Sequence, residues 1–179
     1  MKRAIPTILA LLSLAGAAPC LADEVVWKAD AMSCVPTSAT ASAGNYVTTA
    51  GRVKFARGAV GTLSFICPFD PSDLRFGGRF QLEALVRNRE DFASLYPTVK
   101  AQLRAVRESD GAVLNVLLTD RQDPATIFST FRRLYSRDAL IAWSDDYTYY
   151  VQVTLQRSRI DRIGGVEQIP SLLSVALVE

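Results

Sequence analysis

The stretch "YYVQVTLQRS", residues 149–158, alternates apolar and polar side chains with a period of two. Successive side chains of a β-strand point to opposite faces, so one face of this segment is apolar and the other polar. Such a pattern is typical of an antiparallel strand that covers a core on one side and meets water on the other. We therefore expect four side chains to point inward: Tyr149, Val151, Val153 and Leu155.

The same alternation recurs in "RFQLEALVR" (79–87) and "TVKAQLRAV" (98–106). Two further runs, "AVLNVLLT" (112–119) and "SLLSVALV" (171–178), are apolar enough to be central or terminal strands of the core. A strand is also expected in "EVVWKA" (24–29). The expected inward residues of the two alternating stretches are Phe80, Leu82, Ala84 and Val86 in the first, and Val99, Ala101, Leu103 and Ala105 in the second.

Turn signals separate these strands. Asp110-Gly111 predicts a tight turn between strands that end at residue 106 and begin at residue 112. "GRVKFAR" and "VGTLSFIC" predict a hairpin over residues 52–67 that turns around Gly58. The small, polar, glycine-bearing stretch "TSATASAGN" (37–45) predicts an exposed loop.

Only two stretches favour a helix. "NREDFASLY" (88–96) predicts a short helical turn, and residues 124–140 predict either a helix or a strand-like crossover rich in β-branched and aromatic residues. The pattern as a whole predicts an all-β domain of about eight or nine strands with at most one short helix. An antiparallel β-sandwich or jelly roll fits it best, and a closed barrel is the alternative.

The first residues have the layout of a cleavable secretory signal. Lys2 and Arg3 precede an apolar run from Ile8 to Ala18, and small residues stand shortly before Asp23. The run is too short to span a bilayer. We therefore expect residues 1–22 to be removed and residues 23–179 to form one domain with no membrane span. The short, alanine-rich form favours a bacterial protein exported to the periplasm or out of the cell.

Composition excludes several function classes. The chain has 20 basic and 18 acidic residues, and loss of Lys2 and Arg3 leaves 18 of each. A neutral chain of scattered charges predicts no nucleic-acid surface. The chain has no histidine, which removes the usual general base, the usual zinc ligand and the Ser-His or Cys-His relay. No cofactor is expected.

Cys34 and Cys67 are the cysteines that remain after signal cleavage. In an exported domain, two cysteines predict a disulfide, and their spacing is not that of a Cys-x-x-Cys redox motif. Leu63 and Phe65 share the alternating face of Cys67, so its sulfur is expected to point toward the core. Proline follows each cysteine closely and is expected to end the strand beside the crosslink.

Aspartates cluster in three predicted loops. Side-chain bonds to nearby amides make aspartate a common turn residue, so turn chemistry is the first interpretation. No calcium-loop spacing is present, and no metal is expected; the weak metal candidates are Asp70, Asp73, Asp120 and Asp123. Two facing carboxylates could alternatively be the acid and base of a glycosidase.

The candidate ligand-binding residues lie within eight positions of one another: Trp143, Asp145, Asp146, Tyr147 and Tyr150. Exposed aromatic rings beside carboxylates can form a stacking platform for a sugar or a peptide strand. Alternation sends Tyr149 and Tyr150 to opposite faces, so only one of them is expected to meet solvent. The alternative is that the aromatic residues belong to the core and to a strand entry.

Three functions are compatible with these observations. The first is an exported, disulfide-stapled, non-catalytic β-sandwich that binds a protein or glycan partner through its end loops or an exposed strand edge. The second is an aspartate-dependent hydrolase that acts on a glycan. The third is a purely structural role in the cell envelope.

Overall fold

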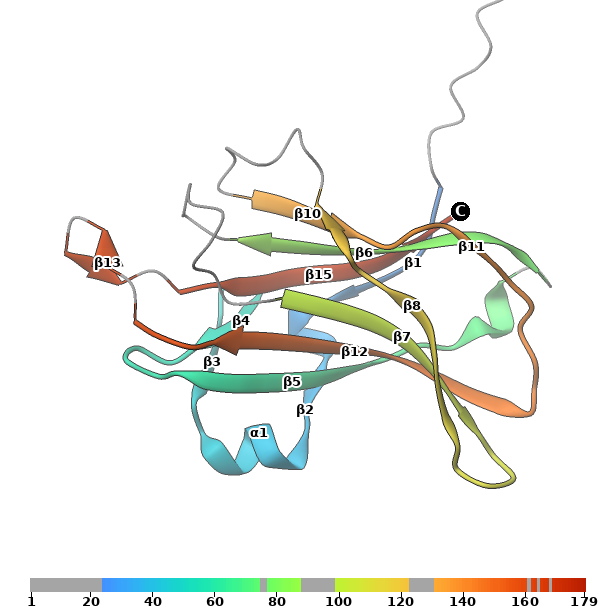
Figure 1. Cartoon of the computed structure of the whole chain (residues 1–179), viewed down its shortest axis with the longest axis horizontal. Coiled ribbons are helices and arrows are strands. Elements are labelled where there is room, and N and C mark those ends of the chain that lie inside the picture. Colours follow the sequence, from blue (N-terminus) through green and yellow to red (C-terminus); the bar gives the residue numbers. More distant parts are fainter. Residues whose placement is uncertain are drawn as a thin grey trace, which may run out of the picture.

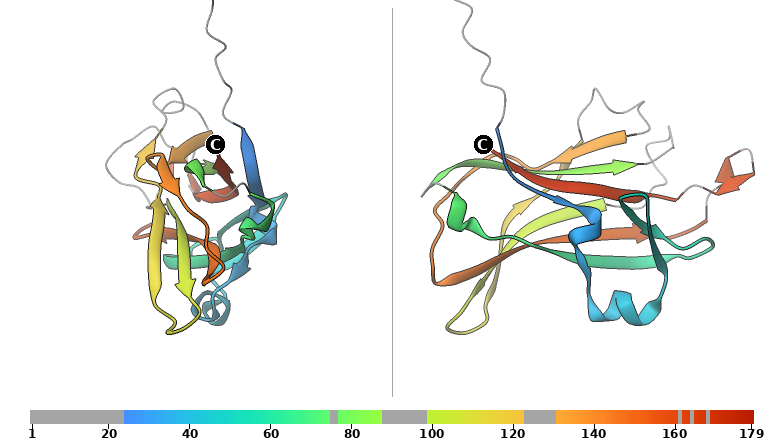
Figure 2. Two further views of the ribbon diagram at one scale, coloured as in Figure 1. Left: turned by 90° about the vertical axis from the view of Figure 1, so that its right-hand side faces the viewer. Right: turned by 180° about the vertical axis from the view of Figure 1, so that it is seen from behind.

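The protein is a sandwich of two antiparallel sheets in the computed structural model (Figure 1). The structure describes residues 24–74, 77–87, 99–122, 131–160, 162–163, 165–167 and 169–179. The predicted signal segment, residues 1–22, lies outside them. Figure 2 shows the two layers from one end and from behind. The prediction of an antiparallel all-β sandwich is confirmed.

The larger sheet has eight strands in the order β3-β4-β15-β6-β10-β9, with β1 paired to β15 and β11 paired to β6. The longest strand of this sheet, β6, pairs with β15 on one side over residues 81–87. On its other side it pairs with β10 over residues 83–87 and with β11 over residues 78–80. The strands are β1 (Val25–Asp30), β3 (Tyr46–Thr49), β4 (Arg52–Phe55), β6 (Gly78–Arg87), β9 (Arg121–Gln122), β10 (Phe131–Tyr135), β11 (Ala139–Ile141) and β15 (Ser171–Val178).

The smaller sheet has five strands in the order β2-β5-β12-β7-β8. The strands are β2 (Val35–Pro36), β5 (Gly61–Pro68), β7 (Val99–Arg107), β8 (Val113–Leu118) and β12 (Tyr147–Arg157). A separate two-stranded hairpin joins β13 (Arg162–Ile163) to β14 (Val166–Glu167). The remaining elements are the helix α1 (Ser38–Ala43) and two single 3-10 turns, Ala31–Ser33 and Pro71–Asp73.

The alternating stretches place their apolar residues where the sequence predicts. In β12 the inward side chains from Tyr149 to Leu155 are buried, and Gln152 and Thr154 between them are partly exposed. The apolar faces of β6 and β7 are buried in the same core. Each large apolar side chain removed from water contributes roughly 1.5–3 kcal/mol, which makes this shared interior the main stabilising feature.

The Asp110-Gly111 turn is also confirmed. It joins β7 to β8, and the Arg107 amide donates to the Ala112 carbonyl oxygen at 2.9 Å. Gly111 has a φ of 70°, in the left-handed region that glycine enters without strain. The Asp110 carboxylate accepts from the Ala112 amide at 2.9 Å and fixes the turn from its other side.

The predicted hairpin over residues 52–67 is wrong. β4 and β5 lie in different sheets: β4 pairs with β3 and β15, whereas β5 pairs with β12 and β2. The hairpin that does form is β3–β4, turning at Ala50 and Gly51, which both have positive φ. A period of two identifies a strand but not its partner, and the residues around Gly58 carry the chain from one layer to the other.

The predicted loop at residues 37–45 is also wrong, because it contains α1. Thr37 is the N-cap residue, its side-chain oxygen accepts from the Thr40 amide, and Gly44 ends the helix with a φ of 61°. These are the usual start and stop residues of a helix. Residues 88–96, predicted as a short helical turn, lie outside the described residues. The described part of 124–140 forms β10 and β11, which agrees with the strand alternative and not with the helix.

The two apolar runs that predict core strands have different positions. β15 lies between β4 and β6 and is buried along most of its length. β8 lies at the edge of the five-stranded sheet, and only Leu117 of its six residues is buried. The prediction of a central or terminal strand is therefore confirmed for both runs: residues 171–178 form a central strand, and residues 112–119 contain a terminal strand that contributes Leu117 to the core.

Candidate functional site

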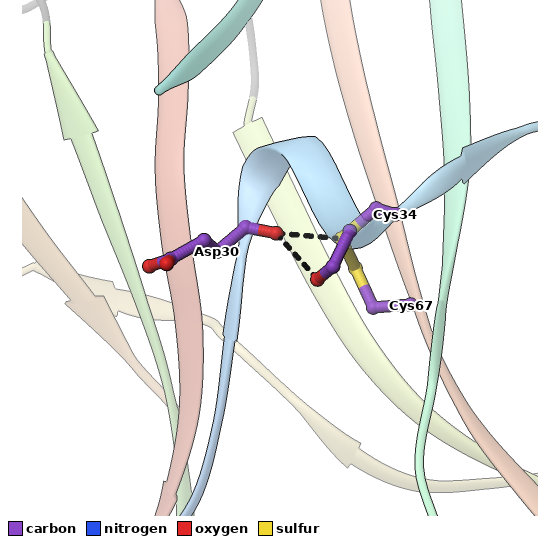
Figure 3. Close-up of a disulfide and its surroundings, with 4 residues drawn as sticks. Asp30, Cys34 and Cys67 are labelled. Carbon is purple, nitrogen blue, oxygen red and sulfur yellow. Dashed lines mark hydrogen bonds between the residues drawn. A yellow bond between two sulfur atoms is a disulfide. The ribbon is translucent and has the colours of Figure 1, made fainter. Parts of the chain in front are cut away.

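Cys34 and Cys67 form a disulfide, as predicted (Figure 3). Val35 of β2 lies opposite Ile66 of β5, so Cys34 and Cys67 occupy the next opposed position, with their Cα atoms 4.1 Å apart. Both residues are buried, and Cys67 points into the core with the apolar face of β5. The bond is therefore a structural clamp, and no free thiol exists at either position.

Trp143 lies in the core. Its ring packs against Phe69, Phe80 and Tyr149, with ring centroids 5.1–5.4 Å apart. The residue is only 7 % exposed, and its indole Nε1 has no hydrogen-bond partner among the described residues. An exposed aromatic platform in this region would therefore have to be built from other rings.

Tyr147 lies at the start of β12 and is covered on one side by Arg107. The Arg107 Nε donates to the Tyr147 hydroxyl at 3.3 Å, and the guanidinium carbon lies 5.8 Å from the ring centroid. This hydrogen bond, with the nearby Asp110 carboxylate at 3.0 Å, raises the pKa of Arg107. One face of the Tyr147 ring is thus occupied by a side chain of the protein itself.

Asp145 and Asp146 form the turn that precedes β12, and both are exposed. The Asp146 amide donates to the Ser144 hydroxyl oxygen at 3.2 Å, and its carbonyl accepts from the Glu108 amide at 2.9 Å. These bonds hold the turn against the β7–β8 hairpin. Turn chemistry accounts for the position of Asp146, while a ligand-binding role for either aspartate stays a prediction.

Tyr150 points to the outer face of the five-stranded sheet, opposite its buried neighbour Tyr149. Its cross-strand neighbours are Pro68 on β5 and Arg104 on β7. The register places three amide side chains on the same face: Gln152 two residues along β12, Gln102 opposite it on β7, and Asn115 opposite Arg104 on β8. We call these five residues, Tyr150, Arg104, Gln152, Gln102 and Asn115, the amide face.

The guanidinium of Arg104 is held in place on this face. Its Nη2 donates to the Gln102 Oε1 at 2.9 Å, while its Nε is shielded from solvent and has no hydrogen-bond partner among the described residues. Sequence reasoning singled out Tyr150 and missed the other four. The available signal was that the polar sides of three strands carry glutamine, asparagine and arginine, whose planar groups suit paired hydrogen bonds.

Of the aspartates proposed as weak metal candidates, Asp70 and Asp73 belong to one 3-10 turn, and Asp120 lies between β8 and β9. Asp70 accepts from the Ser72 amide at 2.9 Å, and this bond lowers the pKa of the Asp70 carboxyl. Asp120 lies 3.9 Å from the Arg137 guanidinium. Asp73 ends the second 3-10 turn, and Asp123 lies outside the described residues. Within the described part of the chain, no three acidic or cysteine side chains are grouped to hold a metal ion.

A cavity of about 520 Å³ opens beside the β13–β14 hairpin. Glu167 at its wall accepts from the Arg157 Nη1 and from the Gly58 amide, both at 2.8 Å. Arg157 is 2 % exposed and also donates to the Ala59 carbonyl oxygen at 2.8 Å. This buried ion pair ties the hairpin to the residues that cross between the sheets. The residues that line the cavity are Val47, Lys54, Phe55, Arg57, Gly165, Glu167 and Ile169.

No known protein family has a model that matches this chain, and no curated protein sequence matches it either. Among the residues that the structure describes, no helix is both long and apolar enough to cross a membrane.

Proposed function

We propose that the chain is an exported, non-catalytic binding domain and that its ligand is a glycan bound on the amide face. Export is supported by the signal-like residues 1–22 and by the Cys34–Cys67 disulfide, since such bonds persist in oxidising compartments. The intact mass of the secreted chain should equal that of residues 23–179, about 2 Da below the fully reduced value.

The observation that carries the glycan proposal is the position of Tyr150 beside Arg104 among three amide side chains. An aromatic ring offers its face to the C–H groups of a sugar ring. Amides and guanidinium groups offer pairs of donors and acceptors that match neighbouring hydroxyl groups. A sheet face with this composition suits an uncharged, extended, hydroxyl-rich ligand.

The hydrolase alternative has no comparable support. A glycosidase needs two carboxylates that face each other across the bound sugar, one of them an acid with a raised pKa. The amide face contains no carboxylate. At Asp70 the Ser72 amide lowers the pKa, which is the wrong direction for a general acid at neutral pH.

The test is a glycan array probed with the oxidised protein, followed by affinity measurements on the best glycan. Tyr150→Ala should weaken binding about tenfold, since loss of a stacked ring costs on the order of 1 kcal/mol. Tyr150→Phe should retain most of the affinity, because the ring remains. Tyr135→Ala is the matched control, a half-buried tyrosine in the other sheet.

Two results would overturn the proposal. The first is an array on which no glycan binds above background while a protein partner is captured. The second is a bound glycan whose affinity does not change in Tyr150→Ala. Thermal unfolding of each variant shows whether a lost affinity reflects the missing ring or a damaged fold.

A further inference from the structure

The β8 edge of the five-stranded sheet is apolar, uncharged and free of proline. Residues 112–118 read "AVLNVLL". Among the described strands β8 pairs only with β7. Three of its large side chains are exposed although they are apolar: Val113 at 51 %, Leu114 at 44 % and Leu118 at 40 %. In the left view of Figure 2, β8 forms the outer side of the sheet.

The remaining described edges lack this combination. An edge strand presents unpaired backbone groups, and proteins usually protect such edges with charge, proline or short length. β2 at the other end of the sheet has two residues and contains Pro36. In the eight-stranded sheet, the edge strands β3 and β9 have four and two residues. β1, which pairs only with β15, has six residues like β8, but it carries Lys28 and Asp30. β8 is therefore the longest uncharged edge strand that the structure describes.

Among the described residues, no strand pairs with the outer side of the β8 backbone. Ala112 and Thr119, just beyond its two ends, both bond to β7: the Arg107 amide donates to Ala112, and the Thr119 amide donates to Ala101. Neighbouring residues of a strand direct their backbone groups to opposite sides. Val113 and Leu118 therefore direct theirs away from β7. Strict alternation would direct the backbone groups of these two residues to opposite sides, because an even number of residues lies between them. The register shift between Leu103 and Arg104 adds one residue to β8, so both residues direct their groups outward.

We propose that a second copy of this chain pairs its β8 antiparallel to this one across a two-fold axis. One register aligns the two ends of the strands: Val113 lies opposite Leu118 of the second copy, and Leu114 lies opposite Leu117. In this register Val113 and Leu118, whose backbone groups point away from β7, face each other and can exchange hydrogen bonds. The side chains of Leu114 and Leu117, which point to the core side of the sheet, then lie next to each other. The two five-stranded sheets then become one continuous sheet of ten strands.

Charge and closure favour a second copy over a foreign strand. A two-fold axis sets this edge against an identical edge, so a charged edge would repel itself, and this edge has no charge. The opposite edge of the sheet is blocked by Pro36 and α1, so pairing through β8 stops at two copies instead of growing into a fibre.

The pairing also concerns the amide face, although it does not depend on a glycan being the ligand. Asn115 belongs to the amide face and to β8, so the two amide faces would meet at the axis on one side of the joined sheet. A dimer would thus offer an extended ligand two adjacent copies of the same surface. Loss of dimerisation with glycan binding retained, or the reverse, distinguishes failure of one proposal from failure of the other.

The first experiment measures the molar mass of the oxidised protein by light scattering over a concentration series. The wild type should approach twice the chain mass, and Val113→Lys/Leu118→Lys should remain monomeric, because four lysines would meet across the axis. Val35→Lys is the matched control, since Val35 is an exposed apolar residue of the opposite edge. It should dimerise like the wild type. Circular dichroism confirms that each variant is folded.

The second experiment fixes the register. Val113→Cys and Leu118→Cys chains, mixed and oxidised, should give a covalent heterodimer, whereas Val35→Cys mixed with Leu118→Cys should not. A wild type that stays monomeric to millimolar concentration would overturn the proposal. So would a dimer that persists in Val113→Lys/Leu118→Lys, or a monomer whose β8 takes up an added peptide strand in place of a second copy.

Discussion

The two edges of the five-stranded sheet differ in how their backbone groups are bonded. At the β2 edge the chain covers its own strand: the Thr37 amide donates to the Ser64 carbonyl at 2.9 Å, and the Ser64 amide donates to the Thr40 hydroxyl at 2.8 Å. Pro36 and the disulfide complete this closed edge (Figure 3). The β8 edge has none of these features among the described residues.

This difference separates two uses of a strand edge. Buried backbone groups are costly when unpaired, so a protected edge adds stability through bonds inside one chain. An open edge leaves the same bonds to be made with another chain. We therefore expect changes at the closed edge to alter the free energy of unfolding, and changes at the open edge to alter association.

The largest effect is expected from removing the disulfide. Cys34→Ala/Cys67→Ala should lower the free energy of unfolding by about 2–5 kcal/mol, because the unfolded chain gains conformational entropy once the crosslink no longer closes a loop. Denaturant unfolding measures the loss, and reduction of the wild type should reproduce most of it. A loss below 1 kcal/mol in both experiments would show that other contacts hold the closed edge.

A smaller loss is expected from Thr40→Val. Valine keeps the shape of the buried Thr40 but removes the oxygen that accepts from the Ser64 amide. The unsatisfied amide should cost about 1–3 kcal/mol in chemical denaturation. Thr62→Val is the control, an exposed threonine at the start of the same strand, β5. If both variants lose the same stability, the Thr40–Ser64 bond does not protect this edge.

A single charge on the open edge should barely change stability. Val113→Lys places its charge on an exposed position, so its free energy of unfolding at low protein concentration should stay within about 0.5 kcal/mol of the wild-type value. The same variant should weaken self-association in the light-scattering series. A large loss of stability together with unchanged association would reverse the roles assigned to the two edges.

The smallest effect concerns salt. An uncharged interface has no ion pairs to screen, so the dimer dissociation constant should change little from about 0.05 to 0.5 M sodium chloride. Sedimentation at the two salt concentrations measures it. A marked weakening with salt would point to a contact through charged residues elsewhere on the chain.

The sequence predicted the fold class and the disulfide because both depend on local patterns. The alternation in residues 149–155 requires a strand with one buried face, and two cysteines in an exported domain favour each other as partners. Strand partners depend on contacts between distant segments. For this reason the pattern predicts the wrong partner for residues 52–55, and it does not tell which of the two apolar runs is central and which is terminal.

The candidate site was predicted less well for a related reason. Trp143 and Tyr147 look alike in sequence, but one is buried against Phe69 and Phe80 while the other is covered by Arg107. Exposure is decided by the opposite sheet and by neighbouring strands, which no local pattern reveals. The amide face likewise takes its residues from three strands, β7, β8 and β12, and exists only once they pair.

The disulfide also determines how the domain can respond to mechanical force. The loop it closes runs through β2 and β5 of one sheet and through β3 and β4 of the other, so the covalent ring passes through both layers. Without the bond, the segment between Cys34 and Cys67, which are 33 residues apart in sequence, would extend to roughly 110 Å under tension. A pull on the chain ends therefore cannot draw out this region while the bond is intact, and the domain resists stretching where its two layers are joined.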